Sequence, residues 1–241
     1  MGFQRAPVCM IPDTTDPAGS DPALLVVDMQ CGAFNADSDA PMACTATSVD
    51  GGLDRVAEYT NDLVEAARNA DVPIIWGKEQ HRPDLADYGA EFLCSEPIHA
   101  LENSEGVSLA SAMDVDDPVS RPAEYEVTKR RYDLFFRTDL EYILETYDID
   151  TVIVTGIMTN ICVHYTAHGA HQRDYAVRVP EECTAAPTEY LHEAGLKFIE
   201  YLQPDSLQSV ADVIGSLETY EGNAIVRHVK ETGTVDPSAR R

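Results

Sequence analysis

The sequence predicts an α/β fold in which a mostly parallel sheet of about six strands carries helices on both faces. Short apolar runs, typical of strands buried on both faces, alternate along the chain with longer segments of helical spacing. Alternating strands and helices join through right-handed crossovers into a parallel sheet. The 241 residues suffice for one full core, so we expect one domain.

Apolar runs define the predicted strands. The first run, Ala-Leu-Leu-Val-Val, contains no polar residue, as expected of a strand that is buried on both faces. In chain order the predicted strands cover residues 23–27, 72–76, 125–128, 151–155, 176–179 and 210–214.

Helical spacing and capping residues predict helices between these strands. Thr138 and Glu141 have the spacing of a capping box, in which a hydroxyl and a carboxylate satisfy the first amides of a helix. A tight loop at 156–160 leads into another helix. The predicted helices cover residues 53–70, 138–147, 161–173 and 188–202.

The ends of the chain differ in composition from its centre. We expect a single α/β domain over residues 22–215, preceded by an extended arm at 1–21 that is rich in Pro, Asp and Thr. Residues 216–241 are expected to form a carboxy-terminal extension whose acidic tail, from residue 231, is mobile.

The composition is strongly acidic, with 42 Asp and Glu against 17 Lys and Arg and a formal net charge of −25. Such a surface repels phosphate backbones and anionic lipids, so nucleic-acid and membrane partners are not expected. Strong salt shortens the Debye length to about 3 Å at 1 M, which screens the self-repulsion of the chain. The acidity therefore favours the hypothesis of a halophilic, salt-filled cytoplasm.

The six cysteines are scattered and form no Cys-x-x-Cys pair, which argues against a zinc ribbon or a thioredoxin-type motif. Free thiols agree with a reducing, cytoplasmic location. No run approaches the roughly 20 apolar residues of a membrane span, and no secretory signal follows the first methionine.

Three reactive side chains fall at the carboxyl ends of predicted strands, where ligands bind in open parallel sheets. Asp28 follows the first strand, Lys129 ends the third, and Cys162 opens the helix after the fourth. Each residue alone has an ordinary reading, as a loop, surface or core residue. Together they predict a catalytic site, since Lys129 is one of only four lysines in the chain.

The three groups suit nucleophilic catalysis. A helix N-terminus and an ammonium both stabilise a thiolate, whose ordinary pKa is about 8.5. Asp28 could take the thiol proton and return it to a leaving amine if a pocket of low polarity raises its pKa. Backbone amides of the loop 156–160 would face the developing oxyanion. The sum is acyl transfer through a thioester, followed by hydrolysis.

Three motifs carry a family resemblance. They read Leu-Leu-Val-Val-Asp28-Met-Gln, Lys129-Arg-Arg-Tyr-Asp-Leu-Phe-Phe-Arg-Thr138 and Val-Thr-Gly156-Ile-Met-Thr-Asn-Ile-Cys162-Val. In order and spacing the chain resembles the isochorismatase-like cysteine hydrolase superfamily over about residues 22–215. The resemblance implies a Rossmann-like three-layer sandwich and an Asp28, Lys129 and Cys162 triad. It also implies a cis peptide between Ile157 and Met158, an oxyanion hole at the Met158 and Cys162 amides, and a homo-oligomer.

Within this superfamily, Cys162 favours an amidase, because isochorismatases proper resemble it in fold but lack the nucleophile. Nicotinamidases carry a metal-binding Asp-x-His with a further His; here residues 78–84 hold only His81, so neither a metal nor another cofactor is expected. The motifs look closer to ureidoacrylate, biuret and N-carbamoylsarcosine amidohydrolases, which implies a small amide, ureido or carbamoyl substrate. The residues expected at the substrate pocket are Phe34, His81, Tyr132, Phe135, Ile157 and Asn160.

Other readings stay open. A non-amide hydrolase of the isochorismatase type and a catalytically silent binding protein share the motifs, whereas a nucleotide-binding redox domain lacks support because no Gly-x-Gly-x-x-Gly follows the first strand. His164, His168 and His171 have i, i+4, i+7 spacing, which suits a metal site but also a packed helix face. Cys183 has no obvious base partner and is expected to be structural.

Overall fold

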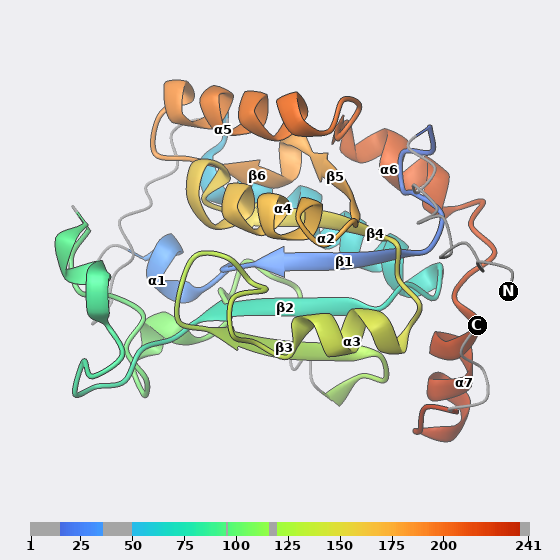
Figure 1. Ribbon diagram of the computed structural model, residues 1–241, viewed down its shortest axis with the longest axis horizontal. Helices are drawn as coiled ribbons and strands as arrows, with labels where there is room; N and C mark the ends of the chain where they lie inside the picture. Colours follow the sequence, from blue (N-terminus) through green and yellow to red (C-terminus); the bar gives the residue numbers. More distant parts are fainter. Residues whose placement is uncertain (1–14, 36–49, 95, 116–119, 237–241) are drawn as a thin grey trace, which may run out of the picture.

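The computed structural model describes residues 15–35, 50–94, 96–115 and 120–236. Within these residues seven strands form one sheet in the order β3-β2-β1-β4-β5-β7, with β6 beside β4, and every strand pairing is parallel (Figure 1). The strands are β1 (Pro22–Val27), β2 (Ile74–Glu79), β3 (Glu124–Lys129), β4 (Thr151–Ile157), β5 (Ala176–Pro180), β6 (Thr184–Ala185) and β7 (Leu207–Gln208). The predicted α/β fold is confirmed.

Helices connect the strands and continue beyond the sheet. They are α1 (Cys31–Phe34), α2 (Gly52–Asn69), α3 (Leu140–Thr146), α4 (His164–His171), α5 (Glu189–Leu202), α6 (Val210–Leu217) and α7 (Ala224–Thr232). A π-helical turn at Thr159–Val163 joins β4 to α4, and short 3-10 turns lie at Gly89–Leu93, Glu105–Val107 and Glu181–Cys183. Thr188 caps α5 by accepting a hydrogen bond from the Leu191 amide, as the predicted helix start requires.

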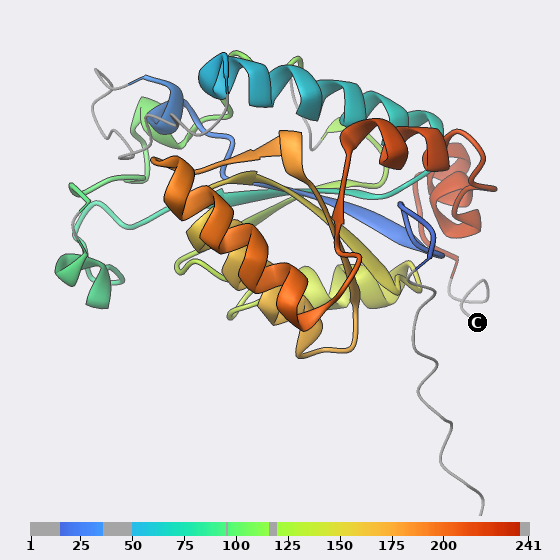
Figure 2. The ribbon, with the colours of Figure 1, turned by 90° about the horizontal axis from the view of Figure 1, so that it is seen from above.

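Two hydrophobic layers enclose the sheet. Figure 2 shows α2 and α6 along one face and α3, α4 and α5 along the other. The apolar side chains of β1 alternate between these layers: Leu24 and Val26 pack towards α2, whereas Leu25 and Val27 pack towards α3 and α4. In the described part of the chain, no helix combines the length and apolar character needed to cross a bilayer.

The predicted strand at 210–214 is wrong. This segment begins α6, whose Ser209 side chain accepts a hydrogen bond from the Asp212 amide. Val210, Val213 and Leu217 are buried on its inner side, a spacing that belongs to a helix and not to a strand. The last strand is instead β7, two residues that pair with β5.

The predicted capping box forms only in part. Helix α3 begins at Leu140, after Asp139, and that residue makes no side-chain cap. The Thr138 hydroxyl accepts a hydrogen bond from the Leu140 amide at 3.3 Å. Glu141 instead accepts one from Arg173 Nε of the neighbouring helix end at 3.1 Å.

The last part of the predicted arm packs against the domain. Ala18 is buried, and the Asp16 carboxylate accepts hydrogen bonds from the backbone amides of Ala18 and Gly19. Arg178 of β5 is fully buried and donates from Nε to the Asp16 carbonyl at 3.0 Å. Residues 15–21 are therefore anchored to the sheet, while residues 1–14 lie outside the described residues.

The order of the strands decides which residues meet. β1 lies between β2 and β4, and β3 flanks β2, so four neighbouring strands end at one edge of the sheet. Gly156 permits the close approach of β4 to β1: its φ is 102°, and a Cβ there would lie 1.9 Å from the Val27 carbonyl oxygen. The sheet thus gathers the loops after β1, β2, β3 and β4 on one side.

Candidate active site

The three predicted residues meet at this edge of the sheet. Asp28 directly follows β1, Lys129 ends β3, and Cys162 lies in the π-helical turn after β4. Lys129 Nζ is 2.8 Å from Asp28 Oδ2 and 3.4 Å from Cys162 Sγ. All three residues are buried, so the ammonium connects the carboxylate and the sulfur away from bulk water.

Glu79, the last residue of β2, is a fourth member that the sequence analysis missed. Its Oε2 accepts a hydrogen bond from Lys129 Nζ at 2.9 Å and lies 3.9 Å from Cys162 Sγ. In the sheet, Glu79 is the direct register partner of Lys129. The strand-end rule that selected Lys129 would have selected Glu79 too, if the second strand had been extended beyond Trp76.

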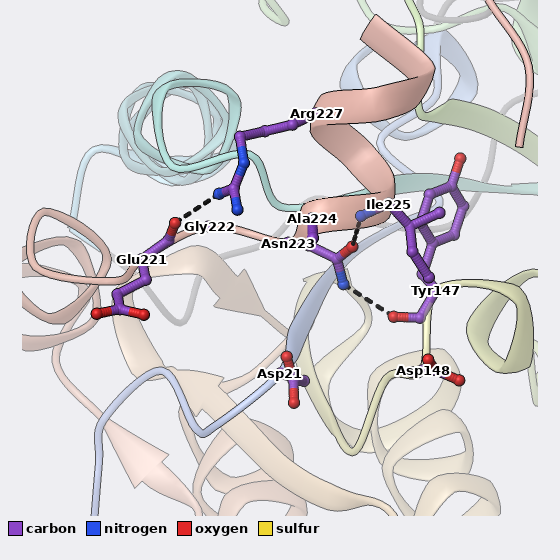
Figure 3. Close-up of a pocket in the computed structure, with 9 residues that line it drawn as sticks. All are labelled: Asp21, Tyr147, Asp148, Glu221, Gly222, Asn223, Ala224, Ile225 and Arg227. Carbon is purple, nitrogen blue, oxygen red and sulfur yellow. Dashed lines mark hydrogen bonds between the residues drawn. The ribbon is translucent and has the colours of Figure 1, made fainter. Parts of the chain in front are cut away.

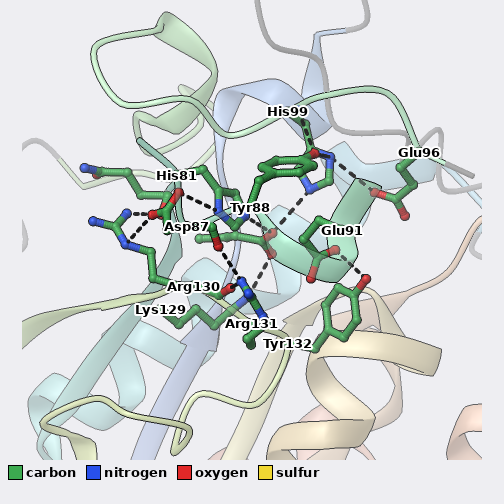
Figure 4. Close-up of polar contacts among 12 residues, drawn as sticks. His81, Asp87, Tyr88, Glu91, Glu96, His99, Lys129, Arg130, Arg131 and Tyr132 are labelled. Atoms are coloured by element: carbon green, nitrogen blue, oxygen red, sulfur yellow. Dashed lines mark hydrogen bonds and ion pairs between the residues drawn. The ribbon is translucent and has the colours of Figure 1, made fainter. Parts of the chain in front are cut away.

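Two imidazoles contact the other oxygen of Glu79. His81 Nε2 is 3.1 Å and His99 Nε2 is 3.2 Å from Oε1, and both rings are buried (Figure 4). His99 lies far along the irregular segment after β2, and no sequence signal singled it out. Its ring nitrogen Nδ1 faces the Pro97 carbonyl at 2.8 Å.

Backbone hydrogen bonds fix the two carboxylates relative to one another. The Glu79 amide donates to Asp28 Oδ1 at 3.0 Å and to Gln30 Oε1 at 2.9 Å. The Gln30 side chain returns a hydrogen bond from Nε2 to the Glu79 carbonyl at 2.9 Å. These hydrogen bonds therefore hold the loop after β1 against the end of β2.

Glu79 and Lys129 are both ionised. Although burial opposes it, Lys129 and the two imidazoles hold the pKa of Glu79 well below its usual range. Burial likewise opposes the charge on Lys129, but Asp28, Cys162 and Glu79 raise its pKa well above the ordinary value. At neutral pH the site thus contains an ammonium and a carboxylate whose charges depend on each other.

Asp28 and Cys162 behave differently. Burial raises the pKa of Asp28, against the attraction of Lys129, which prepares this carboxyl to accept a proton. Burial also raises the pKa of the Cys162 thiol well above its ordinary value; Lys129 opposes this shift, and the nearby Asp28 and Glu79 add to it. The expected stabilisation of a thiolate by the helix N-terminus and the Lys129 ammonium is therefore opposed by burial and by the two carboxylates.

The turn that carries Cys162 is held from two sides. The peptide bond between Ile157 and Met158 is cis, as the resemblance implied. The Thr159 hydroxyl hydrogen-bonds the Thr184 hydroxyl at 2.9 Å and His192 Nδ1 of α5 at 2.8 Å. A Cβ on Gly195 would lie 2.8 Å from the Thr159 carbonyl oxygen, so α5 packs directly on this turn.

The residues expected at the substrate pocket lie in different surroundings. Tyr132 donates from its hydroxyl to the buried Glu91 at 2.6 Å (Figure 4), and Asn160 Oδ1 is buried without a hydrogen-bond partner. Phe34 packs against the core cluster that includes Ile157. The assignment of Phe34, Tyr132, Ile157 and Asn160 to a substrate pocket stays a prediction.

Two of these expectations change with the structure. His81 is fully buried and its Nε2 is directed at Glu79, so it contacts the carboxylate that holds Lys129. Phe135 is buried and stacks on Tyr175, with ring centroids 5.8 Å apart, beneath the Arg173 guanidinium. Tyr175 precedes β5 at the opposite edge of the sheet, so assigning Phe135 to the pocket was wrong.

Possible metal ligands gather at one place in the described residues. Ligand atoms of Asp28, Glu79 and Cys162 lie within 4.8 Å of one another. Lys129 Nζ is within 3.4 Å of each of the three side chains and so fills the centre of this group. This arrangement fits a cation that the chain itself supplies and does not fit a bound metal.

The three histidines of α4 do not converge on one point. The rings of His164 and His168 are 4.1 Å apart, but His171 Nδ1 pairs with the Gln203 amide at 3.1 Å. The spacing of the three histidines therefore reflects helix packing.

A separate hollow lies at the other edge of the sheet. It has a volume of about 430 Å³ and is lined by residues that precede β1 and β4, together with the start of α7 (Figure 3). Asn223 caps α7 here, and the Arg227 guanidinium donates to the Glu221 carbonyl. This lining contains no cysteine, lysine or histidine, and so lacks the groups that make the strand-end site reactive.

Comparisons with known proteins agree with this geometry. The family model of the isochorismatase domain matches residues 22–228. The uncharacterized isochorismatase family protein YaaI of Bacillus subtilis is 28% identical over 184 residues, which cover 75% of this chain and 90% of that protein. The ureidoacrylate amidohydrolase RutB of Caulobacter vibrioides is 26% identical over 210 residues, which cover 81% and 84%.

A solved structure shows the same fold. An isochorismatase family protein from Burkholderia thailandensis superposes with a TM-score of 0.68 at 28% sequence identity, covering 87% of this chain and all of that one. Since the family model spans most of the sequence, and the strand-end cysteine, lysine and aspartate meet in the structure, the chain belongs to the isochorismatase family of hydrolases.

Proposed function

We propose that this protein hydrolyses a carbon–nitrogen bond of a small amide, ureido or carbamoyl compound through a thioester on Cys162. The observation that carries the proposal is the buried contact of one ammonium, Lys129 Nζ, with both the Cys162 sulfur and the Asp28 carboxylate. Acyl transfer requires a nucleophile close to a group that can accept and return a proton, and here Lys129 holds Cys162 and Asp28 together.

In the first half-reaction, the Asp28 carboxylate takes the proton of the Cys162 thiol while the sulfur attacks the carbonyl carbon. The raised pKa of Asp28 suits this transfer, since burial makes the carboxyl a stronger base. The oxyanion is proposed to bind the backbone amides of Met158 and Cys162. When the carbon–nitrogen bond breaks, Asp28 gives its proton to the leaving amine, and a thioester remains.

In the second half-reaction, water attacks the thioester and Asp28 accepts one of its protons. The carbon–sulfur bond breaks, the proton returns to the sulfur, and the acid product leaves. A carbamoyl substrate releases carbamate, which decays to ammonia and carbon dioxide. Lys129 stays charged throughout and stabilises whichever of Cys162 and Asp28 is negative at each stage.

The polar groups near the site support a substrate rich in N–H donors. Glu91 is a buried carboxylate that already accepts from Tyr132, and Asn160 Oδ1 is a buried acceptor without a partner. Ureido and carbamoyl groups offer several N–H donors in a small volume. The similarity to RutB, whose name gives a ureido substrate, points in the same direction.

A direct test is a screen for ammonia release in high salt, over nicotinamide, ureido acids, biuret and carbamoyl amino acids. Cys162→Ser serves as the inactive control, and Cys183→Ser as the matched control, because Cys183 is also buried but lies away from Lys129. We expect at least one amide to be consumed by the parent and by Cys183→Ser only. Consumption of a vinyl ether but no amide would instead identify an isochorismatase-type hydrolase, and no turnover would indicate a silent binding protein.

The setting of the enzyme is part of the same proposal. We propose a reducing cytoplasm, in which the four described cysteines, all free thiols, stay reduced. We also propose a homo-oligomer, which light scattering at high salt would reveal. A hydrolase domain over residues 22–215 with a carboxy-terminal extension completes the proposal.

A further inference from the structure

We propose that Glu79 is a positioning residue for the reaction of Cys162. It directs the Lys129 ammonium between the two reacting groups, and with His99 it keeps the buried cluster electrically balanced. The inference rests on the proposed role of Cys162 as nucleophile and adds a second layer of residues behind it.

Both oxygens of the Glu79 carboxylate have polar partners. Oε2 accepts from Lys129 Nζ at 2.9 Å, and Oε1 faces the Nε2 atoms of His81 and His99 at 3.1 and 3.2 Å. Glu79 is 1% exposed, so water cannot replace these contacts. The ammonium therefore contacts Glu79, Asp28 and Cys162 at once, as an ion pair with Asp28 and as hydrogen bonds with the other two, at heavy-atom distances of 2.9, 2.8 and 3.4 Å.

Sharing the ammonium keeps Asp28 reactive. If Lys129 contacted Asp28 alone, the ion pair would lower the pKa of that carboxyl and weaken it as a base. The negative charge of Glu79 acts in the opposite direction and raises the pKa of Asp28. Glu79 therefore lets one lysine orient two groups without removing the basicity of the first.

The charges of the cluster sum to zero. Glu79 and Lys129 are ionised, and the hydrogen bond and charge of Glu79 outweigh burial to raise the pKa of His99 to about 9, so this ring is protonated at neutral pH. With Asp28 ionised, two negative and two positive charges are present. Transfer of the thiol proton from Cys162 to Asp28 moves the negative charge from oxygen to sulfur and leaves the sum unchanged.

The surroundings of His99 contain further titratable groups. Nδ1 faces the Pro97 carbonyl at 2.8 Å, the Tyr88 hydroxyl at 3.3 Å and the Glu96 carboxylate at 3.8 Å. On the other side of Glu79, His81 Nδ1 is 3.7 Å from Asp87. The Pro97 carbonyl and the Glu96 carboxylate act in the same direction as Glu79, and all three raise the pKa of His99. Asp87 lies beside His81 and not beside His99.

The test is the rate of iodoacetamide alkylation of Cys162 against pH, followed by mass spectrometry of its peptide in the full chain. Glu79→Gln removes a negative charge beside the sulfur, so we expect the midpoint of the curve to fall by about one pH unit. His99→Gln removes a positive charge and should raise the midpoint. Ammonia release by Glu79→Gln should nevertheless fall at least about tenfold, because Asp28 becomes a weaker base.

Glu124→Gln is the matched control. Glu124 is a buried carboxylate at the start of β3, where it accepts from Arg68 and Trp76 far from the triad, so its loss should leave the midpoint in place. Equal midpoints for the parent and Glu79→Gln, or shifts of the same sign for Glu79→Gln and His99→Gln, would overturn the inference. If the two shifts are opposite but the parent hydrolyses no amide, the proposed function fails and the charge balance stands.

Discussion

Removal of the Lys129 ammonium tests the buried charge cluster most severely. Lys129→Met keeps the length of the side chain but leaves Asp28 and Glu79, both within 1% of complete burial, without their shared counter-charge. Breaking a buried ion pair from one side costs about 3–5 kcal/mol. Since whole domains are stable by about 5–15 kcal/mol, the free energy of unfolding should fall by a large fraction.

The loss should depend on pH in a definite direction. Without Lys129, the pKa of Asp28, which burial already raises, would rise further above its unfolded value of about 3.9, because the ammonium that opposes the shift is gone. A carboxyl whose folded pKa is raised favours the folded state only while it is protonated, so the variant loses stability as the pH rises through the folded pKa. The free energy of unfolding of Lys129→Met should therefore lie only slightly below that of the parent near pH 5, and the full loss should be present near pH 8.

Urea unfolding at pH 5 and pH 8, in constant salt, measures this deficit. Lys78→Met is the matched control: Lys78 lies on β2 next to Glu79 and pairs with Glu126 at 3.4 Å, but this pair is partly exposed and contributes under about 1 kcal/mol. The double variant Lys129→Met, Glu79→Gln should recover part of the loss at pH 8. The reasoning would be refuted if Lys129→Met resembled Lys78→Met, or if its deficit were equal at both pH values.

Three further predictions concern the turn, the thiols and the salt. Gly195→Ala places a Cβ 2.8 Å from the Thr159 carbonyl oxygen and should lower ammonia release about tenfold or more. Gly215→Ala, in α6, places a Cβ that meets nothing within 4 Å and should stabilise the fold by about 0.5–1 kcal/mol. Activity and thermal unfolding of both variants check this. Iodoacetamide should label Cys162 before Cys183, because Cys183 is fully buried with a raised pKa, whereas Cys162 is slightly exposed and has Lys129 beside it to stabilise the thiolate as it forms; peptide mapping decides. Raising KCl from 0.1 to 2 M should increase the urea midpoint, since a net charge of −25 is then screened; an unchanged midpoint would contradict adaptation to salt.

The sequence was sufficient for the central strands and for the triad because both depend on local patterns. A continuous apolar run such as 23–27 has few alternatives to a buried strand, and the strand-end rule then placed Asp28 and Lys129 on one edge. The same pattern failed at 210–214, where five mostly apolar residues fit a strand or one turn of a helix equally well. Only the packing of Val213 and Leu217 on the core separates these two states.

The supporting residues depend on contacts that no local pattern reveals. Gly77, Lys78 and Glu79 read as a polar loop, but they continue β2 because Lys129 and two histidines satisfy the Glu79 carboxylate. His99 reaches that carboxylate only through the path of an irregular segment. The prediction that Phe135 lines the pocket was wrong because closeness in sequence does not ensure closeness in space. Phe135 follows Lys129 by six residues, yet the chain turns and directs the ring into the core.

The buried Arg178 makes the segment before the first strand part of the folding unit. A shortened protein that began at Pro22 would withdraw the Asp16 carbonyl from a guanidinium that has no access to solvent. Trimming the amino terminus for expression should therefore stop before residue 15, and a protease that cuts between residues 16 and 21 would loosen β5 from a distance.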